Sequence, residues 1–178
     1  MSSIQVHDGR PTDRRSDVET AVYDLLDDLG IPYQRVDHPP AATIEDCAEV
    51  DEALGITLCK NLFLCDAAGT QFFLLMMPGG KRFKTKDVSR QIGASRLSFA
   101  DADHMMQYLR ITPGAVSVMG LMNDAERRVR LLMDKDLLED AYIGCHPCVN
   151  TVSLKIETGQ LVRKFLVHVG HAPTYVTL

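Results

Sequence analysis

The sequence contains no apolar run long enough to span a membrane, and its amino-terminal residues lack the apolar core of a secretion signal. We therefore expect a cytoplasmic protein with no membrane partner, in which residues 1–15 form a loose leader. The five cysteines are an odd number, which fits a compartment where thiols are normally kept reduced rather than paired.

Signature motifs of several enzyme classes are also missing. The chain has no G-x-S-x-G of the α/β-hydrolases, no H-E-x-x-H of the zinc proteases and no glycine-rich dinucleotide-binding pattern. The Gly-Gly-Lys segment at 79–81 is only a fragment of a phosphate-binding Walker loop. We therefore expect no cofactor and no metal, and no motif supports a covalent protein nucleophile.

The net charge of −5 is unusual for a protein that coats duplex nucleic acid, because such proteins are generally basic. Basic residues are nevertheless concentrated within one stretch of sixteen residues: Lys81, Arg82, Lys84, Lys86, Arg90 and Arg96. Two interpretations remain open. The stretch is either a solvated loop and helix face or a local surface that holds a phosphate backbone.

The 178 residues suffice for one domain with a substantial core, which we place at 16–178. Apolar spacing and capping residues predict helices at 18–29, 44–50, 86–92, 102–109 and 161–169, with Ser16, Thr43, Thr85 and Asp101 as caps. Strands are predicted at 33–37, 57–65, 71–77, 97–99, 116–121, 129–133, 141–145, 151–156 and 175–178. Because several neighbouring strands have only hairpin-length links, the expected fold class is α/β, with a mixed, curved sheet and helices around it.

Lys60 lies in the middle of the apolar strand predicted at 57–65, on the same face as Leu58 and Leu62. A lysine that points into a core is costly unless an anion compensates its charge. A Lys60 that faces a pocket would therefore be a natural receptor for a phosphate or a carboxylate. The alternative is a lysine on an edge strand whose ammonium reaches solvent. Asn61 should point to the opposite face.

Two histidines and one turn are further candidates. His146 and His38 each precede a proline, and His146 stands at a strand end, where side chains often line a cleft, although single histidines are more often structural. The Pro113-Gly114 pair is a turn by default, but its glycine would also let backbone N–H groups approach a substrate oxygen.

The pair Cys145 and Cys148 forms a C-x-x-C pattern, which occurs in redox sites and in halves of zinc sites. No second C-x-x-C supplies further ligands, and a strand rather than a helix is predicted to follow. The pattern thus has little support as a redox or metal site.

Taken together, these segments resemble the YbaK/prolyl-tRNA-synthetase-associated editing domain family, in particular its free-standing alanyl-tRNA(Pro) deacylase branch. The resemblance extends from about Val18 to the carboxyl terminus. Its matching segments are His38-Pro39-Pro40 with Thr43, Lys60 to Leu64, Arg96 to Ala100, Thr112 to Ser117, His146-Pro147 and Asn150-Thr151. No single segment is specific, whereas their order and spacing are.

The resemblance implies hydrolysis of the ester between an amino acid, most simply alanine, and the terminal ribose of proline tRNA. It implies that Lys60 holds the terminal phosphate and that Lys60, His146 and Gly114 form the catalytic site. The matched substrate-binding positions are His38, Thr43, Asn61, Ser117 and Asn150, and the candidate tRNA contacts are Lys81, Arg82, Lys84 and Lys86. In this family the ribose hydroxyl and a positioned water are the candidate attacking groups, because orientation and oxyanion stabilisation suffice for an activated ester.

The implied partner is the acceptor end of tRNA, and delivery by prolyl-tRNA synthetase or an elongation factor is left open. The chain departs from its relatives at Val118-Met119, where they often have proline and an aromatic residue, and at the two cysteines that flank His146-Pro147. Three alternatives therefore remain: a deacylase for cysteine or another small amino acid, a catalytically silent nucleic-acid-binding module of the same fold, and a thiol redox protein.

Overall fold

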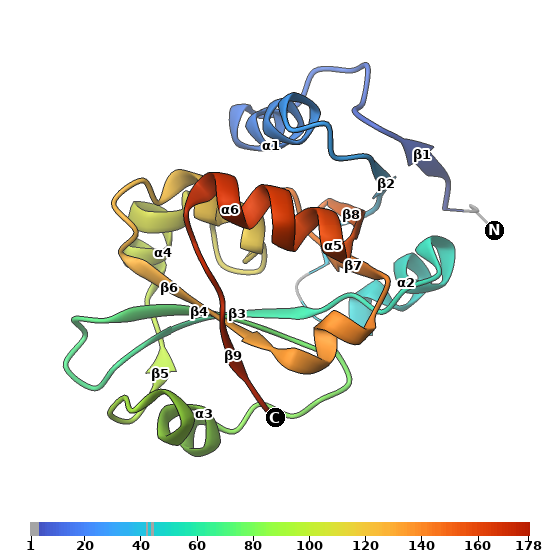
Figure 1. Cartoon of the computed structure of the whole chain (residues 1–178). Coiled ribbons are helices and arrows are strands. Elements are labelled where there is room, and N and C mark those ends of the chain that lie inside the picture. Colours follow the sequence, from blue (N-terminus) through green and yellow to red (C-terminus); the bar gives the residue numbers. More distant parts are fainter. Residues whose placement is uncertain (1–3, 42, 44) are drawn as a thin grey trace.

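The computed structural model describes residues 4–41, 43 and 45–178 (Figure 1). Its helical elements are α1 (Asp17–Asp28), a 3-10 turn (Glu45–Cys47), α2 (Ala48–Leu54), α3 (Thr85–Ile92), α4 (Ala102–Leu109), two 3-10 segments (Val118–Asn123 and Lys135–Glu139), and a continuous run of α5 (Thr158–Gln160), a π-helical turn (Leu161–Phe165) and α6 (Leu166–Val169). Its strands are β1 (Val6–Asp8), β2 (Tyr33–Asp37), β3 (Lys60–Cys65), β4 (Phe72–Met77), β5 (Ser98–Phe99), β6 (Val129–Asp134), β7 (Tyr142–Cys145), β8 (Val152–Glu157) and β9 (Thr174–Val176). No helix among these residues is long and apolar enough to cross a membrane.

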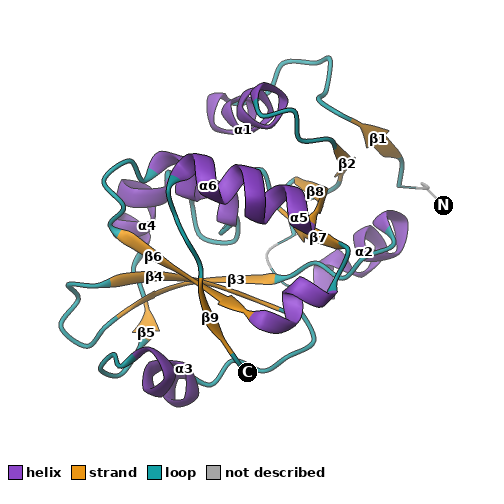
Figure 2. Cartoon of the chain, in the orientation of Figure 1, coloured by secondary structure: helices purple, strands orange, loops and turns teal. Residues whose placement is uncertain are grey.

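The strands form two sheets (Figure 2). The smaller is antiparallel, in the order β1-β2-β8-β7, and the larger is mixed, in the order β5-β3-β4-β6-β9, because the pairs β4–β6 and β6–β9 are parallel. A parallel bridge between Leu58 and Gly144 joins them. The predicted mixed α/β fold is confirmed, but the expected single sheet is split in two, because the β7–β8 hairpin pairs with β2 along the whole of that strand.

The larger sheet is covered on both faces. Even-numbered side chains of β4 belong to a cluster shared with the smaller sheet, α1 and the α5–α6 run, whereas odd-numbered ones pack with Val88 of α3. On β3, Phe63 belongs to the first cluster and Leu64 to the second, so this strand is also buried on both sides. The same alternation sends the side chains of Lys60 and Asn61 to opposite faces.

Most predicted elements are present near the predicted places, but several differ in bounds or type. At 116–121 the backbone forms a 3-10 segment from Val118 instead of a strand, because side chains satisfy its first donors: Ser117 Oγ accepts from Met119 N at 3.1 Å and Asn61 Oδ1 accepts from Val118 N at 3.1 Å. The predicted cap Thr85 is the first residue of α3, and Lys84 occupies the N-cap position without a side-chain bond.

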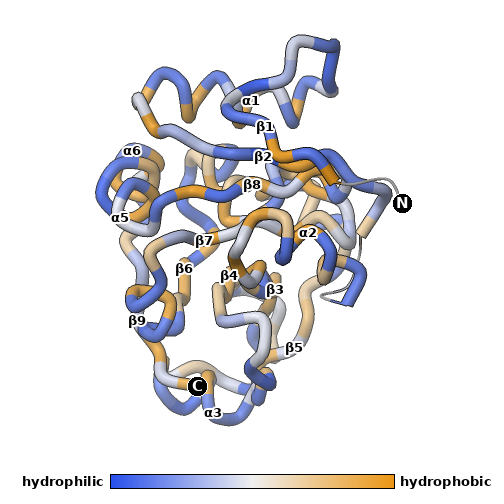
Figure 3. The backbone as a smooth tube through the Cα atoms, turned by 90° about the vertical axis from the view of Figure 1, so that its right-hand side faces the viewer, coloured by the Kyte–Doolittle hydropathy of each residue, from blue (hydrophilic) through white to orange (hydrophobic). Residues whose placement is uncertain are grey.

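The helix predicted at 44–50 starts outside the described residues, since residue 44 is not among them. Its described part differs from the prediction, because Glu45–Cys47 is a 3-10 turn and the α-helix is Ala48–Leu54. Thr43 nevertheless acts as a cap, because its Oγ1 accepts a hydrogen bond from Asp46 N at 3.2 Å and Asp46 Oδ2 accepts from Thr43 N at 3.1 Å. At the other end of the chain, Gln91 of α3 exchanges two hydrogen bonds with the backbone of Thr177, so the chain ends beside α3 (Figure 3).

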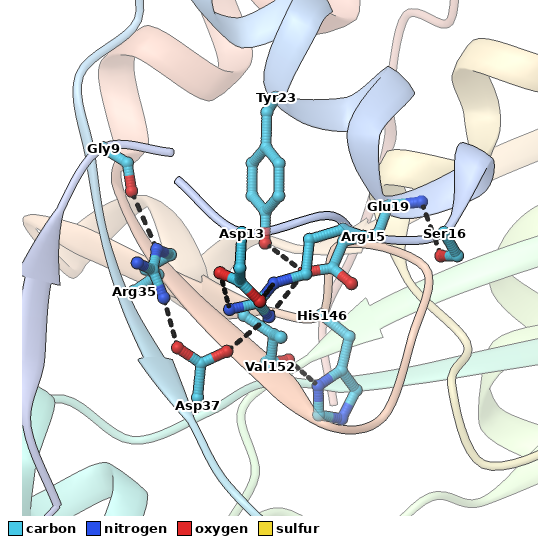
Figure 4. Close-up of polar contacts among 10 residues, drawn as sticks. All are labelled: Gly9, Asp13, Arg15, Ser16, Glu19, Tyr23, Arg35, Asp37, His146 and Val152. Atoms are coloured by element: carbon cyan, nitrogen blue, oxygen red, sulfur yellow. Dashed lines mark hydrogen bonds and ion pairs between the residues drawn. The ribbon is translucent and has the colours of Figure 1, made fainter. Parts of the chain in front are cut away.

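Within residues 1–15, expected to be a loose leader, β1 pairs with β2 along three residues. The segment that follows is held by Arg15, whose Nη1 donates to Asp37 at 2.6 Å and to Glu19 at 3.2 Å (Figure 4). Buried Glu19 also accepts from Tyr23 Oη at 2.6 Å. Burial acts to raise the pKa of Asp37, but Arg15 and Arg35 outweigh it and hold that pKa below its usual value. The network fixes the end of β2, immediately before His38.

Candidate active site

A cavity of about 510 Å³ opens at the start of β3, within the range typical of small-molecule sites. Its walls come from the segment before α2, from residues 58–63, from the β5–α4 connection, from the Pro113–Val116 turn and from the end of β7. Five predicted site residues line it together: Lys60, His146, Gly114, Asn61 and Thr43. They come from four separate stretches of sequence, so tertiary folding alone brings them together.

The bridge between Leu58 and Gly144 explains how Lys60 and His146 reach one cavity. Lys60 lies two residues after Leu58, at the start of β3, and His146 lies two residues after Gly144, next to the end of β7. Cys59 N donates to the Gly144 carbonyl at 3.4 Å next to the bridge. A Cβ on Gly144 would lie 2.4 Å from Leu58 Cδ2, so the close approach of the two chains depends on this glycine.

Lys60 is half-buried, and its Nζ donates to the backbone carbonyl of Lys81 at 2.6 Å. An ammonium carries three donors, so this contact leaves two for a ligand in the cavity. β5 pairs only with Leu64 and Cys65 of β3, which leaves the edge of β3 near Lys60 open to the cavity. Lys60 is therefore a cation held at the rim of the cavity by a neutral partner.

His146 has a defined tautomer. Its Nδ1 lies 2.8 Å from the Val152 carbonyl, which can only accept, so Nδ1 carries the proton and Nε2 of the neutral ring presents a lone pair (Figure 4). Burial lowers the pKa of His146, and the charge of His38 acts in the same direction. The neutral form therefore dominates near pH 7, and its Nε2 makes no hydrogen bond within the described part of the chain.

His38 supports His146 from outside the lining. Buried Ser153 Oγ lies 2.9 Å from His38 Nε2 and 3.4 Å from His146 Nδ1, so one hydroxyl connects the two rings. The rings are 6.0 Å apart between centroids. Ser153 was not a predicted site residue, and the sequence offers no signal for it beyond its place in a predicted strand.

Ser117 and Asn61 shape the same wall. Ser117 Oγ donates to the His146 carbonyl at 2.5 Å, and Asn61 Oδ1 receives the Val118 N–H on the segment that follows the Gly114 turn. Gly114 has a φ of 90°, a conformation that strongly favours glycine. Predicted Asn150 contributes through its backbone, because its carbonyl accepts from Ala41 N at 3.0 Å.

The cysteines do not provide an activated nucleophile. Cys47, Cys59 and Cys145 line the cavity, and all five cysteines of the chain are unpaired. Burial raises the pKa of Cys47 to about 11 and of Cys59 to about 12, and it raises that of Cys145 well above its usual value. Thiols of this kind stay protonated at neutral pH, so they are weak nucleophiles. Among the described residues, no group of His, Cys, Asp or Glu side chains is arranged to hold a metal ion.

The predicted tRNA contacts separate into two kinds. Lys81 Nζ lies 2.8 Å from buried Asp134 and 2.6 Å from Asp136, so this lysine is tied into the fold. Arg82, Lys84 and Lys86 are exposed, and no ion pair to any of them occurs in the described ranges. These three remain candidate phosphate contacts. Phe99 and Met105 also line the cavity and were not predicted as site residues, although Phe99 lies in a matched segment.

Comparisons with known proteins identify the family of this chain. Residues 38–164 match the family described as aminoacyl-tRNA editing domain. The chain is 36% identical over 138 residues to the prolyl-tRNA editing protein ProX of Acetoanaerobium sticklandii, covering 78% of this chain and 84% of that protein. It is 29% identical over 169 residues to prolyl-tRNA synthetase associated domain-containing protein 1 of Danio rerio, covering 94% and 89%.

A solved structure of a candidate trans-editing enzyme for prolyl tRNA synthetase has the same fold, with a TM-score of 0.68, 18% identity, and coverage of 93% of this chain and 99% of the other. The predicted family and the predicted enzyme class, an aminoacyl-tRNA deacylase, are thereby confirmed: the chain belongs to the aminoacyl-tRNA editing domain family.

Proposed function

We propose that the chain is a trans-editing hydrolase that removes a wrongly attached small amino acid, alanine in the first place, from proline tRNA. The observation that carries this proposal is the cavity that Lys60 and His146 both line, in the absence of an activated cysteine among the described lining residues. An aminoacyl ester is already activated, so a site that orients it and stabilises the developing oxyanion can be sufficient.

Each group has a distinct role in the proposed reaction. The free ammonium donors of Lys60 bind the terminal phosphate of the tRNA, and backbone N–H groups of the turn at Gly114 receive the charge that develops on the ester oxygen. Nε2 of neutral His146 accepts a hydrogen bond from the attacking water, which the free ribose hydroxyl helps to place. Water adds to the carbonyl carbon, the bond from that carbon to the ribose oxygen breaks, and the ribose oxygen takes up the proton.

Selectivity follows from size. The pocket must admit alanine and exclude proline, because hydrolysis of correctly charged proline tRNA would be wasteful. Affinity in an apolar pocket separates neighbouring side chains by only about 1–3 kcal/mol, whereas steric exclusion of the larger one discriminates more strongly.

The direct test uses a panel of proline tRNAs charged with alanine, cysteine or proline and measures their hydrolysis by the purified protein. We expect rapid release of alanine and intact prolyl-tRNA. Faster release of cysteine than of alanine would assign the site to cysteine instead. No release from any mischarged tRNA would favour a silent binding module of the same fold.

We also propose that the enzyme acts in the cytoplasm, where charged tRNA is found and where its five thiols stay reduced. Delivery by prolyl-tRNA synthetase or an elongation factor belongs to the same proposal. The corresponding measurement is the deacylation rate with and without each purified partner, and an unchanged rate in both cases would contradict delivery.

A further inference from the structure

Phe99 is an exposed aromatic side chain at the mouth of the cavity. It lies on the edge strand β5, lines the cavity and leaves 65% of its surface accessible to solvent. Among the exposed large apolar side chains of the described residues, it alone lines this cavity. Val167, which is 71% exposed on α6, is a comparable side chain elsewhere on the surface.

The ring of Phe99 is supported from one side. Phe83 meets it edge to face, with 6.0 Å between ring centroids, although the two residues lie sixteen positions apart. This packing fixes one edge of the Phe99 ring while most of the side chain stays exposed. The arrangement is that of a rigid, open aromatic platform rather than of a side chain partly folded into the core.

Basic residues lie close in sequence to the two phenylalanines of this platform. Arg82 and Lys84 flank Phe83 in sequence, and Arg96 lies three residues before Phe99. All three are exposed, and no ion pair involves any of them in the described part of the chain. Exposed aromatic rings next to unpaired cations are the combination by which proteins hold single-stranded nucleic acid, through base stacking and phosphate contacts.

We propose that Phe99, braced by Phe83, stacks on a nucleobase of the single-stranded 3′ end of tRNA as that end enters the cavity, while Arg82, Lys84 and Arg96 contact its phosphates. This inference rests on the proposed function, since it assigns a second contact to the same substrate. It also explains how an acidic protein binds RNA, because the binding surface is small and consists of one aromatic ring and a few cations at the cavity mouth. Stacking does not depend on base identity, because every base has a π-face.

A tryptophan reporter tests the stacking without any chemistry. The chain has no tryptophan, so Phe99→Trp introduces a single tryptophan at the platform. Titration with an uncharged RNA trinucleotide of sequence CCA should quench this fluorescence, and the affinity should fall as salt rises. Val167→Trp, an equally exposed position on α6, is the control and should not respond. No quenching at position 99, or equal quenching at both positions, overturns the proposal.

Substitutions then separate stacking from apolar contact. Phe99→Leu keeps an apolar side chain without a ring, and Phe99→Tyr keeps the ring. We expect Phe99→Leu to raise KM for mischarged tRNA roughly 5- to 150-fold, the range expected for the loss of one stacked base, with little change in kcat and rescue by Phe99→Tyr. If Phe99→Leu leaves KM unchanged while the wild type hydrolyses its substrate, the stacking proposal fails and the deacylase stands.

The opposite result is equally distinct. If the wild type hydrolyses no mischarged tRNA but the Phe99→Trp signal still responds to the trinucleotide, the proposed reaction fails and the RNA platform stands. If Phe99→Leu abolishes binding to purified prolyl-tRNA synthetase but not to the trinucleotide, the exposed ring is a protein-docking residue, and the stacking proposal is wrong.

Discussion

Leu58 and Gly144 pair in a parallel bridge between the two sheets, and this contact holds Lys60 and His146 at one cavity. A methyl group on Gly144 would lie 2.4 Å from Leu58 Cδ2 and 2.6 Å from Ile56 Cδ1, so these side chains would have to move. The bridge is therefore a point at which a small change in volume should alter both stability and the site.

We expect Gly144→Ala to lower the free energy of unfolding by about 1–3 kcal/mol, as overpacking does in other cores, and Gly144→Val to lower it further. Urea unfolding measures the loss, and deacylation should decline in the same order. Gly80→Ala is the matched control, because a Cβ there would meet nothing within 4 Å. Equal stability of the Gly144 and Gly80 variants would contradict the packing argument.

Lys60→Ala should reduce kcat/KM for mischarged tRNA by about 100-fold, because the terminal phosphate loses charge-assisted hydrogen bonds worth about 1.5–3 kcal/mol each. Lys155→Ala is a close control, because Lys155 is also half-buried and its Nζ also donates to a backbone carbonyl, that of Leu54 at 2.8 Å, but it lies outside the cavity. Steady-state kinetics together with circular dichroism make the comparison. Equal losses of activity in both variants would point to a structural role for Lys60.

His146 should make stability depend on pH in a predictable direction. Burial lowers its pKa below the usual 6.5, so as pH falls through 6.5 the unfolded chain gains a proton that the folded chain does not. The free energy of unfolding should therefore fall with decreasing pH, by at most about 1.4 kcal/mol per pH unit, until the folded-state pKa is reached. Urea unfolding between pH 7.5 and 5 should show this slope reduced in His146→Gln. A slope equally reduced in His168→Gln, which alters an exposed histidine, would contradict the assignment.

The thiols should react in an order set by burial. Cys65 is partly exposed, whereas the other four cysteines are buried. A thiol-specific chromogenic reagent at neutral pH should therefore modify Cys65 first and the rest only on unfolding. Replacing Cys145 and Cys148 together by alanine should leave deacylation nearly unchanged. Loss of hydrolysis in a folded double variant would instead support a thiol mechanism.

The exposed basic residues Arg82 and Lys84 should affect tRNA binding, whereas the paired Lys81 should affect stability. Replacing Arg82 and Lys84 by glutamine should weaken tRNA binding and make it less sensitive to salt, because fewer counterions are released. Lys81→Ala should chiefly lower the urea midpoint, since it leaves buried Asp134 without its cation. Filter binding at several salt concentrations distinguishes the two. An unchanged urea midpoint in Lys81→Ala would contradict its structural role.

Local signals in the sequence predicted most elements, because they act over a few residues. Ser16 and Asp101 accept the hydrogen bonds expected of caps for α1 and α4, and Gly93 ends α3 in a left-handed conformation. The family resemblance located Lys60 and His146, which single-residue arguments left open. The helix ends depend on contacts between residues close in sequence, and the resemblance depends on the order of residue types, so a single sequence contains both signals.

Contacts between residues far apart in the chain could not be predicted from the sequence. Nothing local indicates that Ser153 connects His38 and His146, or that Lys81 pairs with Asp134 fifty-three positions away. Such contacts depend on strand register and on which sheet each strand joins, and a single sequence does not encode either in a short window. The same limitation produced one sheet in place of two.

The polar network around Arg15 has a practical consequence for choosing the ends of a shortened chain. The family match begins at His38, but the strand before this histidine, β2, ends at Asp37, which Arg15 contacts from twenty-two positions earlier in the chain. A protein trimmed to residues 38–164 would lose β2, which pairs over five residues with β8, the strand that carries Ser153. The boundary of the matched segment is therefore not the boundary of the packed structure, in which Arg15 contacts both α1 and the end of β2.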